Sequence, residues 1–81
     1  MEIPAKFEVI YNELALPVER VSVGNTTVFR VGLMGKSILV ITRATKENGK
    51  KFWTSIPEGR QSEAELIGPL IESYYRANMN K

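Results

Sequence analysis

The sequence of 81 residues contains no cysteine, no histidine and no aspartate, so all nine of its acidic residues are glutamates. The absence of cysteine excludes disulfide bonds and thiolate metal sites. Histidine is the commonest general base and metal ligand, and aspartate completes most catalytic triads, so the usual equipment of an enzyme is missing. No nucleophilic side chain has an identifiable base beside it in the sequence. We therefore expect a non-enzymatic protein with no cofactor and no metal ion.

Long apolar runs are absent too. No segment approaches the length of a membrane span, and the N-terminus lacks the core of a signal peptide, which predicts a cytoplasmic protein with no membrane partner. The net charge of +2 is too small to indicate nucleic-acid binding by itself. The length and the ordinary apolar fraction of 43% indicate one folded domain over residues 1–81. No sequence motif identifies an activity.

Most of the chain alternates between apolar and polar residues, which is the period of a β-strand. The alternation predicts strands at residues 6–11, 18–23, 26–31, 37–43 and 52–56, with a further extended segment at 14–17. Proline cannot donate to a strand ladder, so Pro17 confines this extended segment to an edge position or the start of a strand. Gly24 and Asn25 form the best-specified hairpin turn, because this pair tolerates positive φ.

A helical period appears only near the C-terminus, at residues 62–77. One apolar stripe contains Leu66, Ile67, Leu70, Ile71 and Tyr74. Ser62 followed three residues later by Glu65 is typical of a capping box in the first turn. Gly68 and Pro69 lie inside the segment and predict a kink, with a hinge or a split into two helices as the alternatives.

These elements predict an α+β fold with two layers. A four- to five-stranded antiparallel β-meander within residues 6–56 packs against one C-terminal α-helix at about residues 62–77. A helix of about 16 residues spans ~24 Å, which is enough to cross such a sheet. Because one helix covers one face only, the other face must contact water, a ligand or another subunit.

The alternation also assigns side chains to the two faces, subject to a slip of one residue that would exchange them. The face under the helix is predicted to carry Phe7, Val9, Val21, Val23, Phe29, Val31, Leu39 and Ile41. The opposite face, called the open face below, is predicted to carry Arg20, Val28, Arg30, Ile38, Val40, Lys51 and Trp53.

This combination of cationic and aromatic residues gives two hypotheses. In the first, Arg20, Arg30 and Lys51 contact phosphates while Trp53 stacks on bases, so that the open face binds single-stranded DNA or RNA. In the second, Val28 and Trp53 belong to an apolar patch that is buried in a homodimer or against another protein, with no nucleic-acid ligand.

The order of strands followed by one helix is similar to that of the Whirly and Pur-type domains, which bind single-stranded nucleic acid. The resemblance lies in the topology alone. It implies an open sheet face and a tendency to dimerise, while a shared fold does not by itself fix the function.

Overall fold

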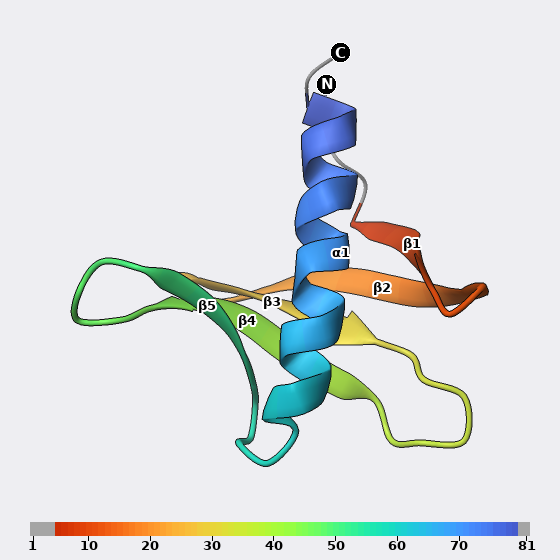
Figure 1. The fold of residues 1–81 in the computed structure, drawn as a ribbon, viewed down its shortest axis with the longest axis horizontal. Coiled ribbons are helices and arrows are strands. Elements are labelled where there is room, and N and C mark those ends of the chain that lie inside the picture. Colours follow the sequence, from red (N-terminus) through yellow and green to blue (C-terminus); the bar gives the residue numbers. More distant parts are fainter. Residues whose placement is uncertain (1–4, 80–81) are drawn as a thin grey trace.

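Five antiparallel strands and one helix make up residues 5–79, the part of the chain that the computed structural model describes (Figure 1). The strands are β1 (Lys6–Tyr11), β2 (Leu14–Val23), β3 (Thr26–Val31), β4 (Leu39–Thr45) and β5 (Lys51–Ser55), and their order in the sheet follows the sequence. The helix α1 (Gln61–Met79) crosses one face of the sheet. The predicted two-layer α+β fold is thereby confirmed, with five strands. Within the described residues, no helix combines the length and the apolarity needed to cross a membrane.

Tight turns set the meander. Gly24 and Asn25 connect β2 to β3 as predicted, with a φ of 62° at Gly24. Asn12 and Glu13 connect β1 to β2, and both adopt positive φ, 51° and 66°. Two-residue turns of this kind match the twist of the strands that they join, so neighbouring strands pair antiparallel from the turn onward.

The strand β2 runs without a break through Pro17, which lies near its middle. β1 pairs with the first part of β2 and β3 with the second part. The Gly32 N–H, one residue past β3, donates to the Pro17 carbonyl at 2.9 Å. The Pro17 nitrogen faces the same side of β2 as the Pro17 carbonyl. Because β3 has just ended on that side, the N–H that proline lacks removes no hydrogen bond from the paired part of β2 and β3. Pro17 is thus not at the start of a strand, because β2 begins at Leu14, but it lies where the pairing of β2 with β3 has ended.

Because β2 continues through Pro17, the side chains of its second half lie on the faces opposite to those predicted. Leu16 and Val18 are buried under α1, whereas Val21 and Val23 lie on the open face. Their assignment to the core was wrong, because a slip of one residue moves every side chain of a strand to the other side. The other predicted core residues of the sheet are confirmed: Phe7, Val9, Phe29, Val31, Leu39 and Ile41.

The buried stripe of α1 is displaced from the predicted one. Ala64, Ile67 and Ile71 are buried against the sheet, while the predicted core residue Leu66 is 55% exposed. The buried side of α1 excludes Leu66 because the helix packs on the sheet at Gly68, which has no side chain and lies on Trp53.

The start of α1 also differs by one residue. The Ala64 N–H donates to the Arg60 carbonyl at 3.1 Å, so Arg60 is the residue before the helix. Ser62 lies inside the first turn and does not take the predicted capping position. α1 continues through Pro69 as one helix, which excludes the split.

Gly68 lies directly on the ring of Trp53. A Cβ atom at Gly68 would overlap the Cγ and its neighbours in the indole, so no larger residue fits unless the helix moves away from β5. The pairing of Gly68 with Trp53 therefore sets how closely α1 approaches the sheet.

We predict that Gly68→Ala lowers the free energy of unfolding by ~1–3 kcal/mol or more, although alanine is the better helix former by ~1 kcal/mol. Urea unfolding measures the change. Ser73→Ala, at an exposed position of the same helix, is the matched control and should be neutral or slightly stabilising. A Gly68→Ala variant as stable as the wild type would show that α1 does not rest on Trp53.

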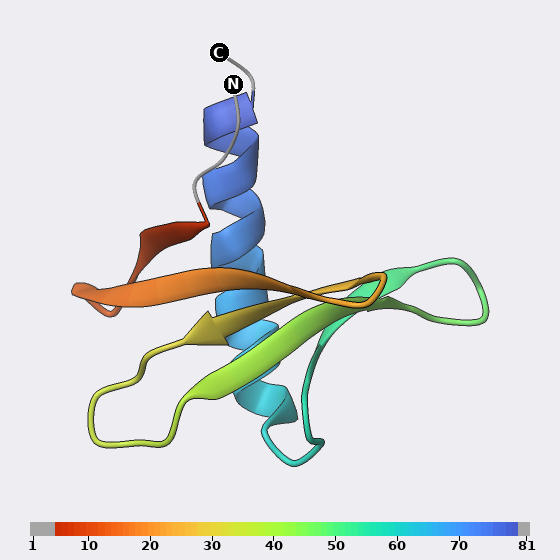
Figure 2. The same ribbon diagram turned by 180° about the vertical axis from the view of Figure 1, so that it is seen from behind.

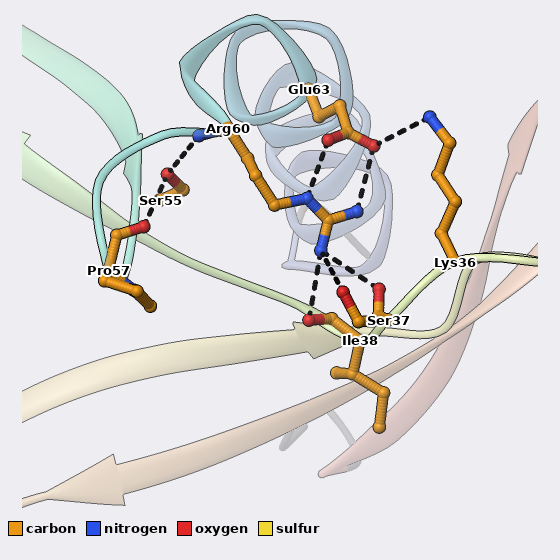
Figure 3. A network of polar contacts seen from close by, with 7 residues as sticks. All are labelled: Lys36, Ser37, Ile38, Ser55, Pro57, Arg60 and Glu63. Atoms are coloured by element: carbon orange, nitrogen blue, oxygen red, sulfur yellow. Dashed lines mark hydrogen bonds and ion pairs between the residues drawn. The ribbon is translucent and has the colours of Figure 1, made fainter.

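The side chain of Arg60 ties the start of α1 to the loop between β3 and β4 (Figure 3). Its Nε and NH2 groups donate to the two carboxylate oxygens of Glu63, at 2.7 and 3.0 Å. Its NH1 group donates to the carbonyls of Ser37 and Ile38, at 3.0 and 3.2 Å. The Arg60 backbone N–H donates to the Ser55 hydroxyl at 3.1 Å. This fork geometry fixes the first turn of the helix against both neighbouring loops.

The pKa of Glu63 lies below its ordinary value of 4.5, mainly because Arg60 donates hydrogen bonds to the ionised carboxylate. Partial burial opposes this shift, and the charges of Arg60 and Lys36 reinforce it. A carboxyl whose pKa is lower in the folded than in the unfolded chain stabilises the fold above the unfolded pKa, and this stabilisation is lost as the pH falls through the folded value.

We therefore expect Glu63→Gln to lower the urea midpoint at about pH 7, and the difference from the wild type to shrink as the pH falls below about 4.5. Glu65→Gln, at an exposed position two residues away, is the control and should change the midpoint little. A Glu63→Gln deficit that stayed constant from neutral to acidic pH would contradict the pKa shift.

Candidate functional site

A groove opens between α1 and the parts of the sheet that extend beyond it. β3 and β4 pair over three residues only, so the β2–β3 and β4–β5 hairpins separate toward their tips. Both hairpins project on the same side of α1 (Figure 1). The groove between them has a volume of about 850 Å³, and three arginines from three elements line it: Arg20 of β2, Arg43 of β4 and Arg76 of α1. We call it the arginine groove.

The carboxylate of Glu72 pairs with two of these arginines. Glu72 lies 3.4 Å from the Nε of Arg43 and 3.8 Å from the NH2 of Arg76, and it accepts a hydrogen bond of 2.6 Å from the Nε1 of Trp53. Arg20 donates to the Tyr75 hydroxyl at the long distance of 3.5 Å. Exposed ion pairs of this length contribute little to stability, so the guanidinium groups can turn toward another anion at small cost.

Aromatic rings lie beneath the arginines. Phe29 packs edge-on against Trp53, with ring centres 5.7 Å apart, and against Tyr75 at 5.9 Å. The indole of Trp53 is only 6% exposed, because α1 covers it. Tyr75 is half-buried and brings its hydroxyl to the groove. Threonine and asparagine side chains of the β2–β3 turn, Asn25, Thr26 and Thr27, complete one wall.

The structure divides the five residues predicted to share one binding face. Arg20 and Trp53 lie on the helix side, and the pairing of Thr45 with Lys51 puts Lys51 on that side as well. Val28 and Arg30 lie on the open face. The prediction that Trp53 is an exposed stacking platform on the open face was wrong. The strand parity of β5 was misassigned, and the unbroken β2 moved Arg20 to the same side.

The open face is apolar with balanced charge. Val28 pairs with Val21 across the strands, and it is 8% exposed without a helix over it. Arg30 lies 3.6 Å from Glu19 and thus has a carboxylate partner of its own. Of the residues predicted here, Arg20, Lys51 and Trp53 are absent from this face, and the aromatic ring that it does carry, Phe52, lies near the β4–β5 turn under the Lys46 ammonium.

Positive charge is concentrated around the arginine groove and in the adjoining β4–β5 hairpin instead. Together they carry six cationic residues and two glutamates, Arg20, Arg43, Lys46, Lys50, Lys51 and Arg76 with Glu47 and Glu72, and the Lys46 ammonium lies over the Phe52 ring on the open face. The described residues contain ten cationic residues and eight glutamates, so their remainder holds four of the former and six of the latter. The local net charge is therefore +4 in one region and −2 elsewhere, an asymmetry that the net charge of +2 conceals.

Three important groove residues escaped the sequence-based search: Arg43, Glu72 and Arg76. A signal for Arg43 was present, because the parity of β4 puts it on the same face as the buried Ile41. Glu72 and Arg76 are four residues apart on α1, a spacing that indicates an ion pair but no ligand site. Their convergence on Arg20 depends on where α1 crosses the sheet.

No protein-family model, curated protein or solved structure matched this chain.

Proposed function

We propose that this chain is a small non-enzymatic module that binds single-stranded DNA or RNA in the arginine groove. The convergence of Arg20, Arg43 and Arg76 from three elements on one groove, against the single carboxylate of Glu72, carries the proposal. A region of net charge +4 in a small protein attracts a polyanion, and the lysines of the β4–β5 loop extend this attraction beyond the groove.

Arginine suits the proposed contacts. Its planar guanidinium group donates two parallel hydrogen bonds to a phosphate, with a fit that the ammonium group of lysine does not offer. In the absence of a ligand, Arg43 and Arg76 share Glu72 at 3.4 and 3.8 Å. A phosphate that enters the groove replaces these weak contacts with stronger ones, while Trp53 continues to hold Glu72 through its hydrogen bond.

The position of the arginines along a groove, and not on a protruding element, favours a single strand. Reading of a duplex requires an element that protrudes into a DNA groove, whereas here the cationic groups lie between two hairpins and a helix. A flexible strand can follow such a channel, and its bases can contact the half-buried Tyr75 and the polar wall at Asn25 and Thr27.

The lining of the groove favours binding over catalysis. Glu72 is its one acidic residue, and it is already engaged by the Trp53 indole and two guanidinium groups. This engagement supports binding without chemical conversion of the ligand.

The test is fluorescence anisotropy of a labelled oligothymidine, titrated with the protein at several salt concentrations. Three phosphate contacts release condensed counterions, so the log–log slope of the association constant against salt should be about −2, at ~0.7 per contact. Arg43→Ala should weaken binding and reduce the slope by about 0.7. Arg30→Ala is the matched control, because Arg30 lies on the open face beside Glu19, and it should leave both values unchanged.

Glu72→Gln should change the affinity for the oligonucleotide in the direction opposite to Arg43→Ala. A glutamine oxygen still accepts the hydrogen bond from Trp53, while the charge that competes with the phosphate disappears, so binding should tighten. If the oligonucleotide does not bind at low salt and tens of micromolar protein, the proposed function is wrong. If Arg30→Ala weakens binding as much as Arg43→Ala does, the site is not the arginine groove.

A further inference from the structure

The open face of the sheet carries apolar side chains that no helix of the described residues covers. Figure 2 shows the sheet from the side opposite α1, and no helix of the described residues crosses it. Val21, Val28 and Val40 lie at its centre, and Ile38 and Ile56 at its edge are 51% and 44% exposed. β-branched residues on an unpaired sheet face are typical of a surface that a partner covers.

The charges on this face alternate in sign across the strands. Lys6 of β1 pairs with Glu19 of β2, and Glu19 pairs with Arg30 of β3. Glu8 lies on the same side of β1, so the face has two cationic and two acidic residues. A nucleic acid gains no net attraction from such a surface, and neither does a strongly acidic or a strongly basic protein.

We propose that the open face is the interface of a homodimer, in which two copies meet face to face about a two-fold axis between β2 and β3. Such an axis reverses the order of the strands in the partner, so β2 of one copy faces β3 of the other. The register then places Glu19 opposite the partner's Arg30 and Val21 opposite the partner's Val28. Each contact occurs twice, as two-fold symmetry requires, and Glu19 and Arg30 each meet an opposite charge, whereas Lys6 and Glu8 on the outer strand β1 face β4 of the partner.

The dimensions of the face set the expected strength. Five strands at ~4.8 Å spacing and six residues at ~3.3 Å make a face of about 24 by 20 Å. This area of about 480 Å² on each partner lies below the ~600–1,000 Å² of standard specific interfaces and is typical of weak association. We therefore expect a dissociation constant of the dimer in the micromolar range, and measurements must cover protein concentrations below and above it.

The dimer leaves the proposed ligand site free. The arginine groove lies on the helix side of the sheet, so the two grooves of a dimer face away from each other. Association can be measured without any nucleic acid. A failure of the dimer and a failure of the proposed ligand are therefore distinguished by separate experiments.

Sedimentation equilibrium of the full chain from about 5 to about 500 µM is the primary test. The average mass should rise from one to two chains over this range. Val21→Lys should reduce the association constant at least about tenfold, because it buries a charge opposite the partner's Val28. Leu66→Lys is the matched control: it makes the same change at an exposed apolar position of α1 and should leave association intact.

A charge exchange tests the geometry itself. Glu19→Arg and Arg30→Glu should each abolish self-association, because each brings like charges together across the two-fold axis. Mixing the two variants in equal amounts should restore dimers, since each variant carries the charge that the other needs. Circular dichroism should show that both variants remain folded. A wild-type chain that stays monomeric at the highest concentration would overturn the proposal, as would association that Val21→Lys leaves unchanged or charge variants that do not pair on mixing.

Discussion

The contact between Trp53 and Gly68 determines how the two layers of this protein fit together. The indole lies flat beneath the one residue of α1 that has no side chain, so the helix approaches β5 as closely as backbone packing allows. The same ring donates a hydrogen bond to Glu72 one helical turn further on, which fixes the rotation of the helix about its axis. At the start of α1, the Arg60 side chain fixes the other end through Glu63 and the loop before β4. The helix is therefore held at two points, and its C-terminal half packs on β1, where Tyr74 stacks on Phe7 (Figure 1).

This placement separates the two chemical surfaces of the molecule. Because α1 crosses the sheet near its middle, the hairpin ends of β2–β3 and β4–β5 extend past it and bring Arg20 and Arg43 beside Arg76. The opposite side of the sheet receives the valines and a balanced set of charges. In our proposal, a polyanion binds the first surface and a second copy of the chain covers the second. The two hypotheses that first competed for one face then have a face each, and neither proposed binding event obstructs the other.

The sequence alone was sufficient for the elements and their order. Alternation located the strands, and the Gly24–Asn25 turn and the C-terminal helix were correctly predicted, because these depend on local periodicity and turn chemistry. The faces depend on more distant information. Pro17 indicated an edge position or the start of a strand, yet it lies inside β2 with its nitrogen pointing past the end of β3, and only the pairing of three strands reveals this. Gly68 was interpreted as a partner of Pro69 in a kink, whereas it accommodates an indole from a strand fifteen residues earlier. The site was mislocated because its residues meet only after the helix has docked.

The single tryptophan offers the most direct measurement of the central claim, that the groove side and not the open face receives the ligand. In a ¹H–¹⁵N correlation spectrum, the Trp53 indole N–H gives one separate resonance, and its hydrogen bond to Glu72 couples it to the carboxylate that Arg43 and Arg76 share. Titration with oligothymidine should shift this resonance together with the backbone amides of Arg43 and Arg76, while those of Val28 and Val40 stay in place. An unchanged indole resonance, with shifts confined to Val28, Arg30 and Val40, would contradict the account and return the ligand to the open face.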